Sequence, residues 1–332
     1  MIAQIDFAYI RTRPWKLWSR LVSYALFEGR PLTTRGRWIN PLVFAHFSLE
    51  RRLPVLRKVE KPVFILGTGR SGTTILGIVL SMHRDVGFLN EPKALWHAVY
   101  PKEDLMGSYS RDDARYRLFE EDASHVVKKT AHRIFGAYLS ATFSRRVLDK
   151  YPELIFRVPF VKAIFPDAKF LLLTRNGWDT CHSIENWSGR LGQQLKNETH
   201  DWWGVNKRKW NLLTEEIVPE HPDLAPHVQQ MRGWTKQTDM AAIEWIVTMR
   251  EGLSLLKNFP GEVLRVHYET LCMEPQETIK KIIRFLELPE DDEQFLEYAK
   301  SALQPAPTKE PFELNQLIEQ PFKKTMFDLG YV

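Results

Sequence analysis

Short apolar runs that end in glycine or polar residues recur along this sequence and alternate with stretches of helical periodicity. These runs predict strands at residues 62–68, 86–89, 170–174 and 263–267. Apolar residues at helical spacing follow the first and the last run, at 71–82 and 276–286. The unbroken apolarity of 170–174 suits a strand buried on both faces. Strands that alternate with helices favour an α/β fold with a central parallel sheet flanked by helices.

Two segments interrupt this alternation. Residues 111–148 show helical spacing and are expected to form a long helix, and residues 187–245 hold six of the eleven tryptophans. We expect both to be helical insertions that wall a substrate cleft, although tryptophan at helical spacing is also typical of a core. Residues 1–60 are basic and aromatic, which predicts a helical extension ahead of one main domain at 61–332.

The strongest local motif is the loop from Gly67 to Thr74, GTGRSGTT, between a predicted strand and a predicted helix. Glycines let successive backbone N–H groups point inward and a helix N-terminus adds partial positive charge, so the segment is typical of an anion-binding loop. Loops that bind nucleoside triphosphates carry Lys after the second glycine, but Thr73 stands there. The strand at 170–174 is followed by Arg175, where such enzymes hold magnesium with an Asp. We therefore expect an anion that arrives without Mg²⁺.

This loop resembles the 5′-phosphosulfate loop of the sulfotransferase family, and Arg175-Asn176-Gly177 with Ser183 is similar to the 3′-phosphate site of that family. The resemblance implies a P-loop-like domain at 61–332 that uses 3′-phosphoadenosine 5′-phosphosulfate (PAPS) as donor, releases 3′-phosphoadenosine 5′-phosphate (PAP) and needs no metal. The donor-binding residues that it implies are Arg70, Ser71, Gly72, Thr73, Thr74, Arg175, Ser183 and Tyr268.

Further segments resemble the family in the same order, so the resemblance extends from about residue 62 to residue 332. They are the "YEDL"-like element at 264–271, which contains Tyr268, and the stretches at 149–152, 156–160, 164–169 and 329–331. Cytosolic members that act on phenols and steroids carry Lys where Arg70 stands and a C-terminal Arg-Lys-Gly motif that is absent here. This departure argues against a phenol or steroid acceptor and favours a carbohydrate, a lipid or another small-molecule alcohol.

Sulfuryl transfer needs a base for the acceptor proton and cations for the charge on the transferred group. Glu91 follows the predicted strand at 86–89, where carbohydrate-type and related bacterial sulfotransferases place a catalytic Glu, and we expect it to be the base. Arg70 is expected to stabilise the bridging oxygen, and Lys150 resembles a lysine that some families place beside the sulfuryl group. The alternative is that Glu91, Arg70 and Lys150 are ordinary charged side chains on the protein surface. Histidine is the competing type of base, because its ordinary pKa lies near neutral pH. The candidates are His97, His125 and His132.

Positive charge is concentrated at the start of the chain. The formal net charge is +5, but residues 1–60 hold 11 Lys and Arg against 4 Asp and Glu. Trp15 and Trp18 share a predicted helix face, which is typical of a helix that rests on an anionic bilayer, and residues 13–26 are therefore expected to make peripheral membrane contact. The alternative is a helix packed on the domain with a solvated basic face. The basic residues around the aromatic face are Arg13, Lys16 and Arg20.

Composition narrows the function further. No apolar run approaches the roughly 18 residues of a membrane-spanning helix, and the first residues do not form a signal peptide, so we expect a cytoplasmic protein, peripheral at the inner face of a membrane. Cys181 and Cys272 are too few for a disulfide framework or a zinc site. No nucleic-acid-binding motif is visible, so no nucleic acid partner is expected. Two alternatives to a sulfotransferase are a P-loop nucleotide kinase and a non-catalytic, membrane-associated nucleotide-binding protein.

Overall fold

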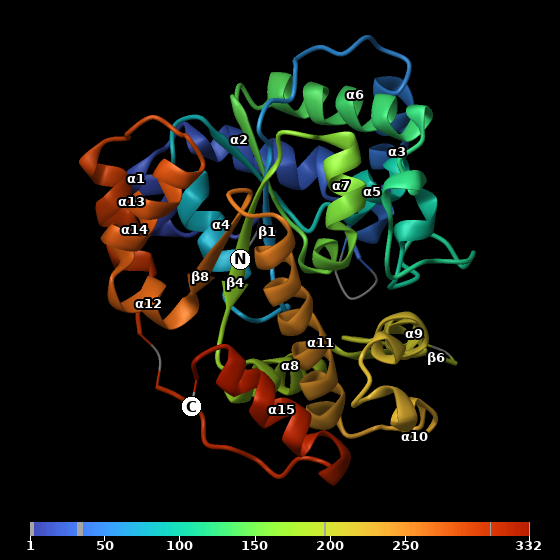
Figure 1. The fold of residues 1–332 in the computed structure, drawn as a ribbon. Coiled ribbons are helices and arrows are strands. Elements are labelled where there is room, and N and C mark those ends of the chain that lie inside the picture. The colour runs from blue at the N-terminus through green and yellow to red at the C-terminus, as the bar shows by residue number, and fades with distance from the viewer. Residues whose placement is uncertain (1–2, 32–35, 196, 306, 332) are drawn as a thin grey trace.

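The computed structural model describes residues 3–31, 36–195, 197–305 and 307–331. At its centre is a five-stranded sheet in which every paired strand is parallel (Figure 1). In spatial order the strands are β2 (Val86–Asn90), β3 (Arg146–Lys150), β1 (Val63–Leu66), β4 (Lys169–Thr174) and β8 (Val263–His267). All four strands predicted from apolar runs are confirmed, and β3 was not predicted.

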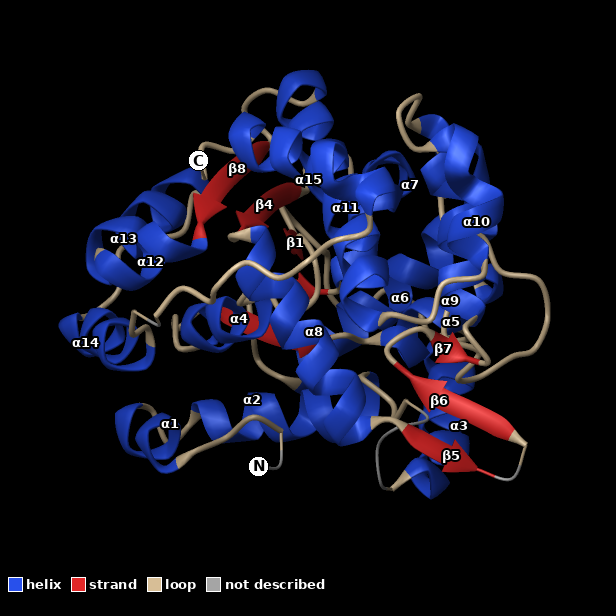
Figure 2. Cartoon of the chain, turned by 90° about the horizontal axis from the view of Figure 1, so that it is seen from below, coloured by secondary structure: helices blue, strands red, loops and turns tan. Residues whose placement is uncertain are grey.

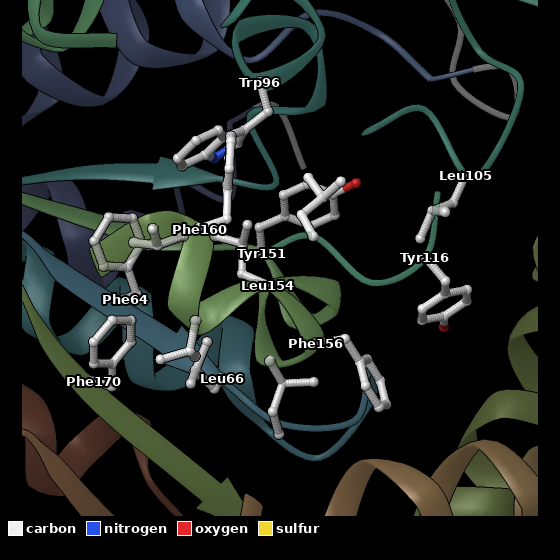
Figure 3. Close-up of a cluster of buried hydrophobic side chains, with 14 of the residues drawn as sticks. Phe64, Leu66, Trp96, Leu105, Tyr116, Tyr151, Leu154, Phe156, Phe160 and Phe170 are labelled. Atoms are coloured by element: carbon white, nitrogen blue, oxygen red, sulfur yellow. The ribbon is translucent and has the colours of Figure 1, made fainter. Parts of the chain in front are cut away.

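Helices cover both faces of the sheet (Figures 1 and 2). Side chains of β1 alternate between the faces: Phe64 and Leu66 belong to one buried cluster, and Val63 and Ile65 belong to the other. Figure 3 shows the first cluster, where Phe64 stacks on Phe170 of β4 with ring centroids 5.7 Å apart. The helices of the main domain are α4 (Thr73–Ser81), α5 (Lys93–Val99), α6 (His125–Ala141), α7 (Val158–Ile164), α8 (Gly177–Leu191), α9 (Arg208–Leu212), α10 (Val228–Arg232), α11 (Gln237–Asn258), α12 (Tyr268–Met273), α13 (Pro275–Phe285), α14 (Glu293–Ala302) and α15 (Gln316–Asp328).

The prediction of one long helix over 111–148 is wrong at both ends. Only α6 is an α-helix there, and the segment closes with β3, which lies between β2 and β1 in the sheet. The polar residues of β3 disguise it in the sequence. Asp149 is fully buried and accepts a hydrogen bond of 2.8 Å from Trp96 Nε1, so a carboxyl group occupies a core position. Burial raises the pKa of Asp149 well above its ordinary value.

The tryptophan-rich segment at 187–245 is not purely helical. It contains an antiparallel sheet of β5 (Gln193–Leu195), β6 (Glu198–Asp201) and β7 (Gly204–Val205), followed by short helices and the start of α11. Some of its tryptophans lie in the hydrophobic core and others line a cavity, which are the two roles expected from the sequence. Trp203, Trp210 and Trp245 are buried in the core, whereas Trp187 and Trp202 line a cavity described below.

The N-terminal extension packs along one edge of the main domain, where α1 (Phe7–Thr12), α2 (Lys16–Val22) and α3 (Asn40–Glu50) lie in Figure 2. The expected outward basic face is wrong, because its three cations point into the protein and are at most 4% exposed. Arg13 pairs with Asp291 at 2.8 Å, and Lys16 Nζ donates to the Val86 carbonyl at 2.7 Å. Arg20 forms an ion pair with Glu28. Within the described ranges, no helix is both long and apolar enough to cross a membrane.

Candidate active site

The loop between β1 and α4 has a backbone that only glycine can adopt at two positions. Gly67 and Gly72 have φ angles of 140° and 96°. A Cβ on Gly67 would lie 2.5 Å from the Leu173 carbonyl oxygen, and one on Gly72 would lie 2.3 Å from the Tyr268 ring. α4 begins at Thr73, so the free N–H groups of its first turn face this loop. The arrangement is that of an anion cradle.

Two adjoining cavities open beside this loop and share Arg70, Arg175 and Ser183. We call them together the donor cavity. The part against the loop measures about 280 Å³, and the part along α8 measures about 590 Å³. Every predicted donor-binding residue except Ser71 lines the donor cavity, and Ser71 is buried beneath the loop, where its Oγ donates to the Thr68 carbonyl at 2.6 Å. Other residues that line the part along α8 are Trp187, Arg190 and Lys309.

Arg175 follows β4 directly and connects the two halves of the donor cavity. Its guanidinium lies 4.4 Å from the centroid of the Tyr268 ring, and Nη1 donates to the Arg70 carbonyl at 3.1 Å. Its buried Nε has no hydrogen-bond partner within the described part of the chain. Ser183 lies two turns into α8, and its Oγ accepts a hydrogen bond of 3.2 Å from Arg70 Nε. A buried donor without a partner next to two further polar groups fits an anionic ligand.

A network behind Arg175 fixes the start of α8. Glu269 Oε1 accepts a hydrogen bond of 2.9 Å from the backbone N–H of Asn176, and Glu269 Oε2 accepts one of 3.0 Å from Tyr331. Asn176 also caps α8 through its side chain, which accepts from the N–H of Trp178. Two segments from the end of the chain, 264–271 and 329–331, therefore meet at the residue that follows Arg175.

Glu91 and Lys150 meet at the carboxyl ends of β2 and β3. The strands are parallel and Asn90 pairs with Lys150 in register, so the next residue, Glu91, is brought back over the lysine. The backbone N–H of Glu91 donates to the Lys150 carbonyl at 2.7 Å, and Lys150 Nζ donates to Glu91 Oε1 at 2.5 Å. Glu91 has a φ of 51°, a left-handed conformation that is uncommon for a side chain of this size. Such strain is found most often at functional sites.

Glu91 belongs to a chain of alternating charges. Lys93 Nζ lies 3.5 Å from Glu91 Oε2 and 3.8 Å from Glu153, and Lys209 links Glu153 at 3.3 Å to Glu244 at 2.5 Å. Burial alone would raise the pKa of Glu91. The charges of Lys150 and Lys93 and the hydrogen bond from Lys150 outweigh burial and hold this pKa well below its ordinary value. Glu91 is therefore ionised at neutral pH, as a proton acceptor must be.

A small cavity of about 80 Å³ lies next to Glu91, and we call it the acceptor cavity. Gly69 of the phosphate loop and Trp202 both line this cavity and pack closely together, since a Cβ on Gly69 would lie 2.4 Å from the Trp202 ring. Trp187 packs edge-on against Trp202 with centroids 5.3 Å apart and also lines the donor cavity. The other lining residues are Pro31, Glu91, Lys93, Met106, Pro152, Glu153 and Lys209.

The segment that carries most of the residues lining the two cavities matches a known family. The model of the sulfotransferase family matches residues 62–226, which include the phosphate loop, Glu91, Lys150 and Arg175. The chain belongs to the sulfotransferase family.

Individual sulfotransferases are distant from this chain. The protein-tyrosine sulfotransferase of Drosophila melanogaster is 25% identical over 249 residues, which cover 74% of this chain and 40% of the fly protein. Protein-tyrosine sulfotransferase 1 of Danio rerio is 24% identical over 243 residues, which cover 72% of this chain and 57% of the fish protein. This chain thus spans about half the length of these relatives. The sulfotransferase domain from the curacin biosynthetic pathway is 15% identical, with a TM-score of 0.47 over 83% of this chain and 99% of that domain.

The three histidines considered as alternative bases for this sulfotransferase-family member do not line either cavity. His97 Nδ1 lies 3.1 Å from the Pro101 carbonyl oxygen, and His132 Nε2 lies 3.0 Å from the Ile164 carbonyl oxygen. His125 is exposed at the start of α6.

Sequence reasoning missed several charged residues at the site. Arg190 lies two turns beyond Ser183 on α8, and helical spacing could have found it. Lys209 and Lys309 come from an insertion and from a loop without regular spacing, so no sequence signal pointed to them. Lys93 lies two residues after Glu91, but the sequence does not show that Lys93 is buried in the folded protein.

Proposed function

We propose that this protein transfers a sulfuryl group from PAPS to an acceptor hydroxyl, with Glu91 as the general base. The observation that carries the proposal is the shared lining of the two cavities. Gly69 and Arg70 of the phosphate loop line the acceptor and donor cavities respectively, and Glu91 lines the acceptor cavity together with Gly69. A base and an anion cradle on one cleft are the two parts that sulfuryl transfer requires.

The donor cavity has the polar groups that PAPS would need. The loop amides and Thr73 and Thr74 would hold the 5′-phosphosulfate. Arg175 and Ser183 would hold the 3′-phosphate, and the unpartnered Nε of Arg175 supports this assignment. Tyr268, which already packs against Arg175, would lie against the adenine. Arg190 and Lys309 add positive charge to the same cavity.

In the reaction the acceptor oxygen forms a bond to sulfur while the bond between sulfur and the 5′-phosphate oxygen breaks. The electron pair of that bond leaves with PAP, and the acceptor proton passes to a Glu91 oxygen. Arg70 would offset the charge that develops on the bridging oxygen, and Lys150 would offset charge on the sulfuryl oxygens. We propose that no metal takes part, because Thr73 replaces the lysine of nucleoside triphosphate loops and Arg175 follows β4.

We propose a phenolic hydroxyl on a larger acceptor, such as a tyrosyl side chain, as the preferred nucleophile. A carboxylate whose pKa is held well below its ordinary value by neighbouring lysines is a weak base. Proton transfer to it from a phenol with a pKa of about 10 is less uphill than from an alcohol with a pKa near that of water, about 16. Trp187, Trp202 and Met106 offer apolar surface for an aromatic ring. The names of the fly and fish relatives support a protein acceptor, which differs from the carbohydrate, lipid or small-molecule alcohol expected from the sequence.

Radiolabelled PAPS would test both parts of the proposal. The purified full chain is incubated with labelled donor and with peptides that differ only in carrying Tyr, Phe or Ser at one position. We expect label in the Tyr peptide alone. Label in the Ser peptide or in a carbohydrate acceptor, at a rate equal to that of the Tyr peptide, would overturn the phenolic acceptor and keep the sulfotransferase.

The same material distinguishes the two alternatives. Magnesium-dependent turnover of ATP, with no transfer from PAPS, would indicate a nucleotide kinase. Tight binding of PAP, with no transfer from PAPS to any acceptor or to components of a cell extract, would indicate a non-catalytic nucleotide-binding protein.

A further inference from the structure

Exposed apolar side chains are concentrated in the N-terminal extension. Of the 18 large hydrophobic side chains that are exposed within the described residues, 11 lie between Phe7 and Leu56. The three exposed tryptophans, Trp15, Trp18 and Trp38, are all among them. The described part of the main domain exposes no tryptophan to this degree, so the surface of the extension differs in kind from the rest of the protein.

Most of the exposed charges of this segment are positive: Arg11, Arg51, Arg52 and Lys58 are exposed, and the exposed carboxylates are Asp6 and Glu60. Within the described ranges 7–31 and 36–56, both carboxylates, Glu28 and Glu50, are buried. The outer surface of the extension is thus apolar and mainly cationic, with no exposed carboxylate in those ranges. α3 also exposes apolar side chains, because Leu42 and Leu49 are exposed.

A second element joins this surface beside α2. Trp18 Nε1 donates to the carbonyl of Ala141 at 3.0 Å, which brings the turn after α6 next to Trp18. Phe143 in that turn is 80% exposed and has a φ of 52°. A left-handed conformation strains a bulky side chain, and core packing does not account for it because the ring is in solvent. Arg145 follows, with a side chain that is 75% exposed and an Nε that lies 3.7 Å from Asp85 Oδ1. We call Trp15, Trp18, Leu21 and Phe143 the aromatic face.

We propose that the aromatic face rests on a lipid bilayer that contains anionic phospholipid. Tryptophan and phenylalanine favour the headgroup region of a bilayer, and exposed arginines bind lipid phosphates. The charge of the extension complements an anionic surface, since its exposed cations outnumber its exposed carboxylates. Contact would use aromatic side chains and Arg11 or Arg145, whereas the cations at 13, 16 and 20 hold α1 and α2 on the main domain.

The buried contacts of the extension determine what such binding would achieve. Arg13 reaches Asp291, and Lys16 reaches the carbonyl of Val86 in β2. The extension is therefore attached to the sheet that carries the active site. A bilayer bound to the aromatic face would hold the whole domain in one orientation instead of tethering it by a loose segment.

Co-sedimentation of the full chain with vesicles tests this proposal. Vesicles of phosphatidylcholine mixed with phosphatidylglycerol are compared with vesicles of phosphatidylcholine alone. We expect the protein to sediment with the anionic vesicles and to bind them less as salt is raised. Phe143→Asn suits the left-handed turn and keeps the fold, and it should weaken vesicle binding roughly three- to tenfold because one aromatic ring no longer enters the bilayer.

Phe327→Ser is the matched control, since Phe327 is 70% exposed on α15, outside the aromatic face. It should leave vesicle binding unchanged. The proposal fails if the wild-type protein stays in the supernatant with anionic vesicles, or if both variants lose binding equally. It also fails if light scattering without lipid shows a dimer that Phe143→Asn dissociates, because the aromatic face would then be an interface between two copies.

Discussion

Glu28 Oε1 accepts a hydrogen bond of 2.8 Å from the backbone N–H of Asn90, the residue directly before Glu91. Arg20 holds the other oxygen of Glu28 at 2.9 Å and donates to the carbonyl of Phe88 at 3.1 Å. Both side chains are at most 5% exposed. A buried ion pair from the N-terminal extension thus fixes the end of β2, from which Glu91 turns back in a left-handed conformation.

Glu28→Gln should therefore lower kcat without weakening the donor complex. The amide retains the size of the carboxylate, but Arg20 loses its charged partner, and breaking a buried pair costs about 3–5 kcal/mol. We expect kcat to fall roughly tenfold as Glu91 shifts, and PAP affinity by calorimetry to stay unchanged. Glu60→Gln, which removes an exposed partner of Lys58, is the control. Equal kcat for the wild-type protein and a folded Glu28→Gln variant would show that this pair does not position the base.

Glu91→Gln tests the base itself. The amide keeps the shape and can still meet Lys150, but it cannot accept the acceptor proton. Turnover should fall by roughly 10²- to 10⁴-fold, measured in single-turnover experiments so that chemistry is observed. PAP binding should change little. A variant that binds PAP normally and keeps more than about a tenth of wild-type turnover would rule Glu91 out as the base.

Arg175→Ala should remove the discrimination between PAP and AMP. Loss of a charged hydrogen bond weakens binding by about 1.5–3 kcal/mol, so PAP affinity should fall roughly tenfold or more, whereas AMP affinity should change little. Isothermal titration calorimetry with both nucleotides measures this difference. The assignment of the 3′-phosphate site is contradicted if the wild-type protein already binds AMP as tightly as PAP.

Sulfuryl transfer should continue in EDTA. The charge that a metal would supply in a nucleotide kinase is assigned to Arg70, Lys150 and the loop amides. The measurement is the transfer rate from labelled PAPS before and after dialysis against EDTA, with magnesium added back to a second sample. Loss of transfer that magnesium restores would contradict the metal-independent mechanism.

Stability should rise with pH through the titration of Lys16. Burial, with a smaller effect of the Arg13 charge, lowers the pKa of Lys16 to about 7. Between about pH 7 and the ordinary lysine pKa of about 10.4, the unfolded chain binds the proton that the folded chain has lost, so raising the pH favours folding.

Comparison of wild type with Lys16→Met isolates this effect. The difference in unfolding free energy should shift toward the wild type by on the order of 1 kcal/mol per pH unit above pH 7. Lost hydrogen bonds to backbone carbonyls change the offset between the two proteins and not the slope. Parallel stability curves for the two proteins over this range would show that Lys16 does not titrate there.

Strands with apolar side chains on both faces, such as 170–174, are predicted correctly, and β8 is predicted although it carries Arg265. β3 escapes prediction because Asp149 and Lys150 occupy buried positions, where tertiary hydrogen bonds and ion pairs replace the apolar signal. Its neighbours β2 and β1 are far away in sequence, so no local pattern shows that a strand must fill the gap between them.

Of the predicted site residues, those on segments with a local motif lie together in the structure, and their roles stay predictions. The phosphate loop and Arg175 with Ser183 are local motifs of this kind, and the structure brings them together in the donor cavity. The partners of Glu91 come from β3, α5 and α9, and only the fold joins them. The inward orientation of the cations at 13, 16 and 20 was likewise hidden, because helical periodicity gives the face of a residue but not what covers it.

The ion pair between Glu28 and Arg20 lies in the N-terminal extension, whereas the residues that line the two cavities come almost entirely from the rest of the chain. A protein shortened to begin at residue 61 would keep every residue proposed to touch donor or acceptor, except Pro31 of the acceptor cavity. It would lose the hydrogen bond from the Asn90 N–H to Glu28. It would also lose Arg13, the ion-pair partner of Asp291, whose side chain is 2% exposed. Nucleotide affinity would survive such shortening better than turnover, so a binding assay on the shortened protein would report a working donor cavity in an enzyme whose base is out of place.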